Sequence, residues 1–354
     1  MEKQRIVFIS SWHETPGRGG VHAFCLRDDG KPVGRGFLPL VCAGYLAFNR
    51  RRDRLYATCR ADASGDGAAA FAVDADGGFS ALGGIVPSGG RSTCHLSVAP
   101  GEKYLYAANY LSGSFSEYLL DGDGAILRCS RIIRHEGSGP NAERQEMAHP
   151  HCCVFSPAGD FLAVADLGCD TVSCYPFSPE SGIDEAHPVV NHLVPGSGPR
   201  HILFDPGSRF AYVINELGNS VSSFVFDAGR LCPVDELSLL PRGAECPTKA
   251  AALRFSADRK FLVCSNRGFD SLCTVSLGPG GRLSAAALTL SGGSSPRDVN
   301  FVGDGSLLAA GNEFSDEVRF FDFDAASGRL SPNGYRLEMP RPLCILPLCG
   351  LQKA

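Results

Sequence analysis

A short turn-forming corner recurs six times along the chain, roughly every 50 residues. The corners are residues 49–53, 99–103, 156–160, 205–209, 256–260 and 302–306. Each corner is followed by an apolar strand that ends in polar residues, such as LYAANY or FLAVAD, and then by a small-residue turn and a further strand. Repeats of 40 to 50 residues with about four strands each are typical of β-propeller blades.

The two ends of the chain together supply a seventh repeat. Residues 6–12 match the second strand of the repeat, residues 21–26 match the third, and residues 340–348 match the first. A blade built from both termini closes the ring and removes the free sheet edges. We therefore predict an all-β, single-domain fold over residues 1–354: a seven-bladed β-propeller of four-stranded antiparallel blades, with one blade shared between the N- and C-termini.

The composition agrees with this fold and excludes several functions. Forty-two glycines and 23 prolines leave little room for long helices, and 44% hydrophobic against 20% charged residues indicates a well-buried chain. A net charge of -5 gives no support for nucleic-acid binding. The N-terminal MEKQRIVFIS lacks the apolar core of a signal peptide, and no long apolar run follows. We expect a cytoplasmic protein, a monomer or weak homodimer, with no nucleic-acid or membrane partner.

The cysteines are expected to be reduced. Their number is 15, an odd count in a large chain. Several of them, such as Cys152, Cys153, Cys264 and Cys273, lie inside apolar strand sequences. Free thiols in the core are the better interpretation than a disulfide framework.

Two sets of equivalent positions follow from the repeat, and both are expected near the channel at one face of the ring. The set ahead of the first strand is Gly44, Cys94, His151, Arg200, Ala251, Arg297 and Arg341. The set that ends the second strand is Trp12, Arg60, Tyr110, Leu167, Glu216, Arg267 and Glu313. Four or five arginines, two glutamates and a histidine then converge on one cavity, of a size that suits a small molecule.

The arginines predict a small anionic substrate. Each guanidinium donates two hydrogen bonds to a carboxylate or phosphate, so Arg200, Arg267, Arg297 and Arg341 together favour anion binding. The alternative is a ring of arginine and glutamate ion pairs that only fills the channel. His151 beside Glu216 can supply a general base with an orienting carboxylate.

Other polar residues are assigned structural roles. Adjacent strand residues point to opposite faces, so His149, His151, Cys152 and Cys153 cannot converge on one ion. We therefore expect no metal and no cofactor. His95, His149 and His201 are interpreted as structural, and Asp166 and Asp170 as caps of the turn between strands. The chain has no Gly-x-Ser-x-Gly motif, which argues against a serine nucleophile.

Four strings resemble the lactonase seven-bladed propeller family, which includes bacterial propeller-type 6-phosphogluconolactonases and fungal carboxy-muconate cyclases. They are HPHCCVFSPAGDFLAVADLGCD, GSGPRHILFDPGSRFAYVINELGNSV, AALRFSADRKFLVCSNRGFDSL and SPRDVNFVGDGSLLAAGNEFSDEV. The resemblance spans nearly the whole chain and implies a site for a sugar lactone or a lactonising dicarboxylate. By its similarity to the cyclase branch, it implies catalytic roles for His151, Arg200, Glu216 and Arg267. Arg297, Arg341, Glu313 and Tyr110 are then expected to bind substrate.

The chain departs from the family pattern in its first complete repeat. It has Cys42-Ala43-Gly44 where an Asn-Pro-Ser turn is usual, and Arg60 where a glutamate usually ends the strand. An extra positive charge at Arg60 suits a more anionic ligand.

Three functions remain open on the sequence. The favoured one is a metal-independent lactonase that hydrolyses a sugar lactone, above all 6-phosphogluconolactone. In it Glu216 or His151 accepts a proton from water, Arg200 and Arg267 stabilise the oxyanion, and Arg297 or Arg341 holds a phosphate. The alternatives are a muconate-type lactonising cyclase and a non-enzymatic propeller that binds an anion or a protein.

Overall fold

A computed structural model describes residues 5–63, 65–74, 76–207, 209–244 and 246–348. Residues 1–4 of the N-terminal stretch considered above and Ser208 of the corner at 205–209 lie outside the described part, as do residues 64, 75, 245 and 349–354. The described residues form 30 strands and two short 3-10 helices, η1 (Tyr110–Ser112) and η2 (Pro279–Gly281). None of these helices is long and apolar enough to cross a membrane.

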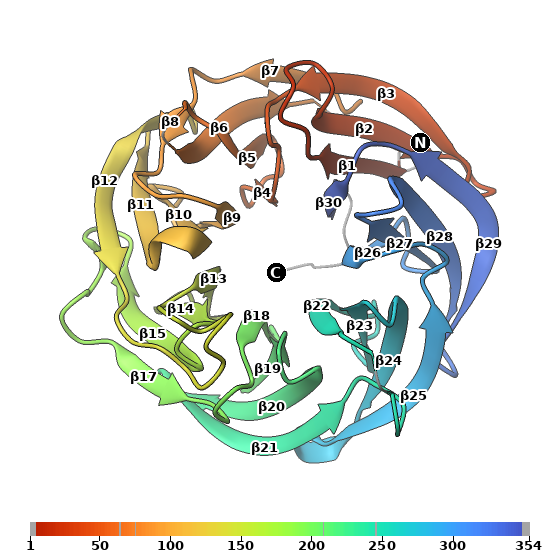
Figure 1. Cartoon of the computed structure of the whole chain (residues 1–354). Coiled ribbons are helices and arrows are strands. Elements are labelled where there is room, and N and C mark those ends of the chain that lie inside the picture. Colours follow the sequence, from red (N-terminus) through yellow and green to blue (C-terminus); the bar gives the residue numbers. More distant parts are fainter. Residues whose placement is uncertain (1–4, 64, 75, 208, 245, 349–354) are drawn as a thin grey trace.

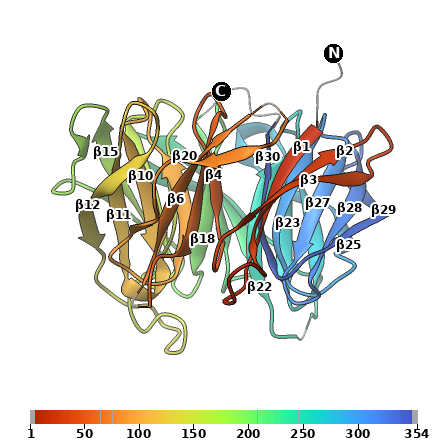
Figure 2. The same cartoon turned by 90° about the horizontal axis from the view of Figure 1, so that it is seen from above.

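Seven antiparallel sheets are arranged around a central channel, as Figure 1 shows along the axis and Figure 2 from the side. In each sheet the strands follow one another outward, and the first strand lies nearest the axis. This confirms the predicted all-β, seven-bladed propeller. In blades one and three the outermost strand is broken into two short segments.

The blades are numbered from the first complete repeat. Blade one holds β4 (Leu46–Phe48), β5 (Arg54–Arg60), β6 (Asp66–Val73), β7 (Phe79–Ala81) and β8 (Val86–Pro87). Blade two holds β9 (Thr93–Val98), β10 (Tyr104–Asn109), β11 (Ser114–Leu120) and β12 (Ile126–Arg134). Blade three holds β13 (Pro150–Phe155), β14 (Phe161–Asp166), β15 (Thr171–Ser178), β16 (Gly182–Ile183) and β17 (Val189–His192). Blade four holds β18 (Pro199–Phe204), β19 (Phe210–Asn215), β20 (Ser220–Asp227) and β21 (Arg230–Ser238).

The remaining blades follow the same pattern. Blade five holds β22 (Lys249–Phe255), β23 (Phe261–Arg267), β24 (Ser271–Leu277) and β25 (Leu283–Leu290). Blade six holds β26 (Pro296–Val302), β27 (Leu307–Asn312), β28 (Glu317–Asp324) and β29 (Arg329–Glu338). Blade seven holds β30 (Pro342–Pro347), β1 (Arg5–Ser11), β2 (Gly20–Leu26) and β3 (Pro32–Pro39).

Blade seven is the blade shared between the termini. Its strand order is β3-β2-β1-β30, and Phe8 pairs with Leu346 while Ile9 pairs with Ile345. The predicted division into a first strand from the C-terminal part and three strands from the N-terminal part is therefore confirmed.

The recurrent corners are tight turns between the first and second strands of each blade. In five of them the backbone N–H of the fourth residue donates to the carbonyl of the first, for example Gly159 to Ser156 and Arg259 to Ser256, at 2.9 and 3.0 Å. The side chain of Ser156 also accepts the N–H of Phe161 at 3.1 Å. Such turns need only a few turn-forming residues and fix the register of the hairpin. This explains why the repeat can be recognised in the sequence.

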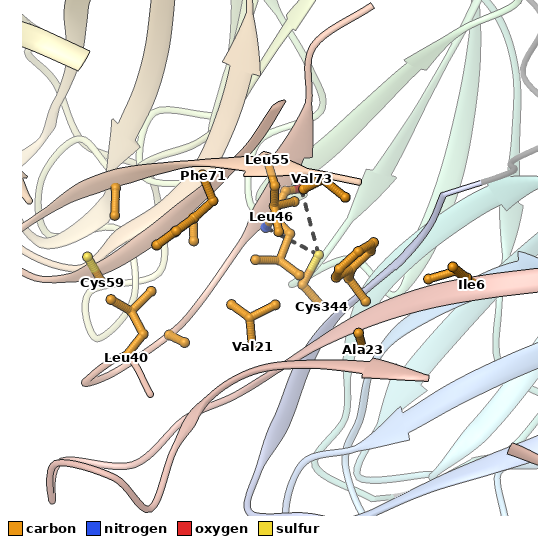
Figure 3. Packing of buried hydrophobic residues seen from close by; sticks show 14 residues of the cluster. Ile6, Val21, Ala23, Leu40, Leu46, Leu55, Cys59, Phe71, Val73 and Cys344 are labelled. Carbon is orange, nitrogen blue, oxygen red and sulfur yellow. Dashed lines mark hydrogen bonds between the residues drawn. The ribbon is translucent and has the colours of Figure 1, made fainter. Parts of the chain in front are cut away.

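The hydrophobic core is divided into clusters between neighbouring blades. Figure 3 shows the cluster that joins blades seven and one, where Val21 and Leu46 pack around Cys344. The N–H of Leu46 donates to Cys344 Sγ at 3.4 Å across the blade boundary. The 14 cysteines within the described residues are all free thiols, and Cys152, Cys153, Cys264 and Cys273 are buried, as predicted.

Candidate functional site

A β-bulge recurs near the start of the innermost strand. In blade four, Pro199 pairs with Asn215 and His201 with Ile214, so Arg200 is the extra residue between two paired positions. The residues in the same situation in other blades are Cys94, His151, Arg297 and Leu343. A bulge breaks the alternation of a strand and re-aims the extra side chain. In these five blades the bulge therefore places one equivalent side chain around the channel. In blade five two residues, Ala251 and Ala252, lie between the paired positions, and the pairing of β4 with β5 in blade one shows no bulge.

This bulge corrects the predicted register in one blade. Leu343, not Arg341, is the extra residue in blade seven. The carbonyl of Arg341 accepts the N–H of Trp12 at 3.1 Å, as the carbonyl of Gly198 accepts that of Glu216 at 2.7 Å, so Arg341 corresponds to Gly198. The counting was wrong here because β30 and β1 are not consecutive and no hairpin corner joins them. His151 also lies within β13 and not just before it.

The second predicted set lies where expected. Its members end the second strand of their blade or follow it directly: Trp12, Arg60, Tyr110, Leu167, Glu216, Arg267 and Glu313. The first and second strands of a blade are antiparallel, so the start of one and the end of the other meet at the same end of the sheet. Both sets therefore lie at one end of the channel.

Glu216 is the centre of the first charged group, which we call the Glu216 cluster (Arg144, Arg200, Glu216 and Arg267). Its Oε2 is 3.1 Å from Arg200 Nε and 2.7 Å from Arg267 Nη2, and its Oε1 is 2.7 Å from Arg144 Nη2. Glu216 and Arg200 are only 2% and 3% exposed. Arg200 Nη1 also donates to the carbonyl of Ala251 at 2.7 Å, which fixes the guanidinium between blades four and five.

The ionisation of this cluster follows from its charges. Burial alone would raise the pKa of Glu216, but the charges of Arg267 and Arg200 lower it well below its usual range. Burial, together with the charges of Arg267 and Arg297, lowers the pKa of Arg200 to about 10. At neutral pH Glu216 is a carboxylate and Arg200 remains cationic.

A second group, the Glu313 cluster (Arg297, Glu313 and Arg341), lies on blades six and seven. Glu313 Oε2 is 3.2 Å from Arg297 Nη1, and its Oε1 is 2.5 Å from Arg341 Nη2. The guanidinium of Arg341 stacks on Trp12, 4.4 Å from the ring centroid. The side chain of Arg341 thus reaches Glu313, although Arg341 does not occupy the position equivalent to Arg200 that the sequence predicted for it. The two clusters contain five arginines and two glutamates, an excess of three positive charges.

A cavity of about 510 Å³ opens beside the clusters. Its lining includes Arg200 and Arg297, together with Trp12, Leu343 and several residues of blades one and two. The volume is in the range of small-molecule sites. The other six predicted site residues lie outside this lining, but the contacts between side chains link them to Arg200 and Arg297. Glu216 and Glu313 are thus ion-paired, as expected if arginine and glutamate pairs only fill the channel. A cavity nevertheless remains beside these pairs.

The departures from the family pattern in blade one are found in the wall of this cavity. Cys42, Gly44 and Arg60 all line it. Arg60 does not add an uncompensated charge, because its Nε is 3.1 Å from Asp66 Oδ1. The Cβ that any other residue would carry at Gly44 lies 2.5 Å from Thr58 Oγ1, so a side chain here would clash with Thr58.

His151 is buried beside aromatic rings. Its ring lies 5.7 Å from that of Tyr110 and 5.3 Å from that of His201, both edge to face. Its Nδ1 has no hydrogen-bond partner among the described residues, so Glu216 does not orient the imidazole through this nitrogen. Burial and the charge of Arg200 lower the pKa of His151 well below its usual value, which keeps the ring neutral.

Tyr110 lies between the histidines of blade three and the Glu216 cluster. Its ring stacks on His149 at 4.4 Å, and its hydroxyl accepts a hydrogen bond from Arg144 Nη2 at 3.1 Å. Burial raises the pKa of Tyr110, so the phenol is neutral at physiological pH.

Asp166 and Asp170 cap turns, as predicted. Asp166 Oδ1 accepts the N–H groups of His149, Gly168 and Cys169 at 2.7 to 3.1 Å. Asp170 accepts the N–H of Gly196 at 2.6 Å. Within the described part of the chain, no group of three or more His, Cys, Asp or Glu side chains has the arrangement of a metal site.

Several residues of the site, Arg144 and His201 among them, were missed by the sequence reasoning. Arg144 belongs to the long connection between β12 and β13, which has no equivalent in the other repeats and so gave no register signal. His201, predicted to be structural, lines the cavity next to Arg200. Its position directly after the bulged residue is the signal that could have identified it.

Comparisons with known proteins agree with this architecture. The family model described as lactonase, 7-bladed beta-propeller matches residues 4–347. The chain is 34% identical to an uncharacterized protein of Lactococcus lactis subsp. lactis over 294 residues, which are 82% of this chain and 84% of the relative. It is 29% identical to the 6-phosphogluconolactonase of Bacillus subtilis over 338 residues, 93% of this chain and 94% of that protein.

Solved structures show the same likeness. The periplasmic gluconolactonase of Pseudomonas aeruginosa superposes with a TM-score of 0.90 at 26% identity, covering 98% of this chain and 99% of that one. A protein from Lactobacillus plantarum superposes with a TM-score of 0.89 at 26% identity, covering 97% and 99%. With the family model matched over nearly the whole length, the chain belongs to the lactonase family of seven-bladed β-propellers.

Proposed function

We propose that this protein is a lactonase that hydrolyses an anionic sugar lactone, with 6-phosphogluconolactone as the foremost candidate substrate. The observation that carries the proposal is the excess of arginines over glutamates beside a cavity of about 510 Å³. A phosphate or carboxylate on the substrate compensates this charge. Relatives that are named 6-phosphogluconolactonase and gluconolactonase support the substrate class.

His151 is better suited than Glu216 to accept the proton of the attacking water. Glu216 is a weak base, because three arginines hold both of its oxygens and lower its pKa. His151 is neutral, its buried Nδ1 has no hydrogen-bond partner among the described residues, and its ring packs against His201, which lines the cavity. Part of its low pKa comes from the charge of Arg200, so an anionic substrate that compensates Arg200 raises the basicity of His151 toward the range that general-base catalysis needs.

The reaction follows from these roles. Water attacks the lactone carbonyl while His151 takes its proton, and the carbonyl oxygen becomes an oxyanion that accepts hydrogen bonds from Arg200. The ring C–O bond then breaks, and His151 returns its proton to the leaving alkoxide, which gives the hydroxy acid. Arg297 holds the anionic substituent at the cavity wall. A preorganised oxyanion donor of this kind contributes about 3 to 4 kcal/mol to the transition state.

The experiment measures acid release at pH 7 from 6-phosphogluconolactone and gluconolactone, corrected for spontaneous hydrolysis. We expect a faster rate with the phosphorylated lactone, and loss of most of the enzymatic rate in the variants His151→Ala and Arg200→Met. The control is His187→Ala, which changes an exposed histidine. Rates that equal the spontaneous background for both lactones contradict the proposal. Turnover of unsaturated dicarboxylates without lactone hydrolysis would indicate a cyclase.

A further inference from the structure

Arg144 is the only member of the Glu216 cluster that comes from outside the repeats. The connection that carries it runs between β12 and β13, and its side chain reaches both blade two and blade four. Both contacts are made by one nitrogen: Nη2 is 2.7 Å from Glu216 Oε1 and 3.1 Å from the hydroxyl of Tyr110. Nη1 is buried and has no hydrogen-bond partner among the described residues.

The connection is folded around a buried glutamine next to Arg144. Gln145 is 0% exposed, its Nε2 donates to the carbonyl of Leu167 at 2.8 Å, and its Oε1 accepts the N–H of Asn141 at 3.1 Å. The N–H of Gln145 donates to the carbonyl of Asn141 at 2.7 Å, which closes the turn. The Oδ1 of Asn141 accepts the N–H of Arg144 at 3.2 Å. The backbone that carries the side chain of Arg144 is therefore held in place against blade three.

The position of Arg200 depends on this contact through Glu216. Arg200 Nε bonds to Oε2 of Glu216, and Arg144 holds the other oxygen of the same carboxylate. If Arg144 is removed, Oε1 becomes a buried acceptor without its charged donor, which is costly. The carboxylate then turns so that both oxygens face Arg200 and Arg267, and donors of Arg200 are withdrawn from the cavity.

We propose that Arg144 is a positioning residue for the proposed lactonase reaction: it holds Glu216 in the orientation that directs Arg200 toward the substrate. The inference rests on the proposed function for its kinetic part only. Arg144 is not part of the cavity lining, so its effect is expected on the transition state more than on substrate binding.

The kinetic test compares Arg144→Met, Arg144→Lys and the matched control Glu143→Gln, which lies exposed on the same turn. For Arg144→Met we expect kcat to fall by about tenfold to a hundredfold, as for a small misplacement of a catalytic group, while KM changes by less than about threefold. A lysine presents one charged nitrogen and can rebuild the bond to Glu216, so Arg144→Lys should recover a large part of kcat. A rise in KM with kcat unchanged contradicts the positioning role, because it means that Arg144 binds the substrate directly.

A crystal structure of Arg144→Met tests the inference without any activity. We expect the carboxylate of Glu216 to rotate and Arg200 Nη1 to leave the carbonyl of Ala251, which it now contacts at 2.7 Å. If Glu216 and Arg200 stay in place, the positioning role is overturned, whatever the wild type hydrolyses. If they move but the wild type hydrolyses no lactone, the proposed function fails while the positioning of Arg200 by Arg144 holds.

Discussion

Arg254 and Asp298 form a buried ion pair between blades five and six, with Arg254 Nη2 and Asp298 Oδ1 2.9 Å apart. The other carboxylate oxygen of Asp298 accepts the N–H of Ile345 in blade seven at 2.8 Å. Asp298 also lines the cavity directly after the bulged Arg297. One carboxylate thus connects three blades beneath the candidate site.

Removal of this carboxylate should strongly reduce stability. We expect Asp298→Ala to lower the free energy of unfolding by about 3 to 5 kcal/mol, because Arg254 is left as a buried charge without its partner. Denaturation in guanidinium chloride measures the effect. The control is Glu338→Ala, which breaks the exposed pair with Arg336 and should change the free energy by less than about 1 kcal/mol. Equal changes in the free energy of unfolding for both variants would show that the buried ion pair stabilises the fold no more than the exposed pair does.

Stability should fall as the pH falls below about 6.5. Burial lowers the pKa of His95 to about 3, and burial lowers the pKa values of His151 and His201 well below 6.5. Below pH 6.5 the unfolded chain binds protons at these residues and the folded chain does not, so each histidine reduces the free energy of unfolding by about 1.4 kcal/mol per pH unit. Above pH 6.5 this contribution is fully present.

Urea unfolding between pH 5 and 8 measures this dependence. The variant His95→Gln should show a smaller slope of stability against pH, because one of the imidazoles with a lowered pKa is absent. The exposed His187 provides the control, since His187→Gln should leave the slope unchanged. A slope in His95→Gln that equals that of the wild type contradicts the explanation.

Thiol labelling should distinguish an exposed cysteine from a cysteine in the cavity wall by the rate of modification. Cys232 is exposed, whereas Cys94 lies in the cavity wall, where burial raises the pKa of its thiol to about 12. We expect iodoacetamide at pH 7.5 to modify Cys232 rapidly without loss of lactone hydrolysis, and Cys94 slowly with inactivation. Mass spectrometry of digested samples follows each site. Inactivation that keeps pace with the modification of Cys232 would be inconsistent with this assignment.

The closing strand should be essential for the ring. Deletion of residues 342–354 removes β30, which leaves β1 without its inner partner and exposes the buried side chains of Val7 and Ile9. We expect an aggregating chain without a cooperative thermal transition, as seen by circular dichroism and gel filtration. Ile345→Ala keeps the strand and should remain folded, with a loss of about 2 to 5 kcal/mol. A soluble, cooperatively folding deletion variant would contradict the role of β30.

Much of the fold could be predicted, because each blade repeats the same local solution. The corner at residues 156–160 needs only a serine cap and a glycine with positive φ, and such turns recur visibly in the sequence. The same counting made His151, Arg200 and Arg297 equivalent, and the structure shows each of them as the extra residue of a bulge. It was wrong for Arg341, since the strands of blade seven come from opposite ends of the chain.

The details of the site could not be predicted, because they depend on the reach of side chains. No repeat marks Arg144, and no pattern indicates that Glu216 is held by three arginines. The expected extra charge of Arg60 is cancelled by Asp66. Arg60 ends β5 and Asp66 begins β6, so this ion pair lies across the turn of one hairpin. Nor does the repeat show that Gly44 packs so closely on Thr58 that a Cβ there would lie 2.5 Å from Thr58 Oγ1.

The shared blade has a consequence for biosynthesis. β1 leaves the ribosome before the other described strands, but its inner partner β30 is made only after more than 300 intervening residues. At about 5 to 20 residues per second, the first strand waits on the order of tens of seconds with one edge unpaired. The ring cannot close before β30 is synthesised, so during this interval the inner edge of β1 is open to pairing with other chains.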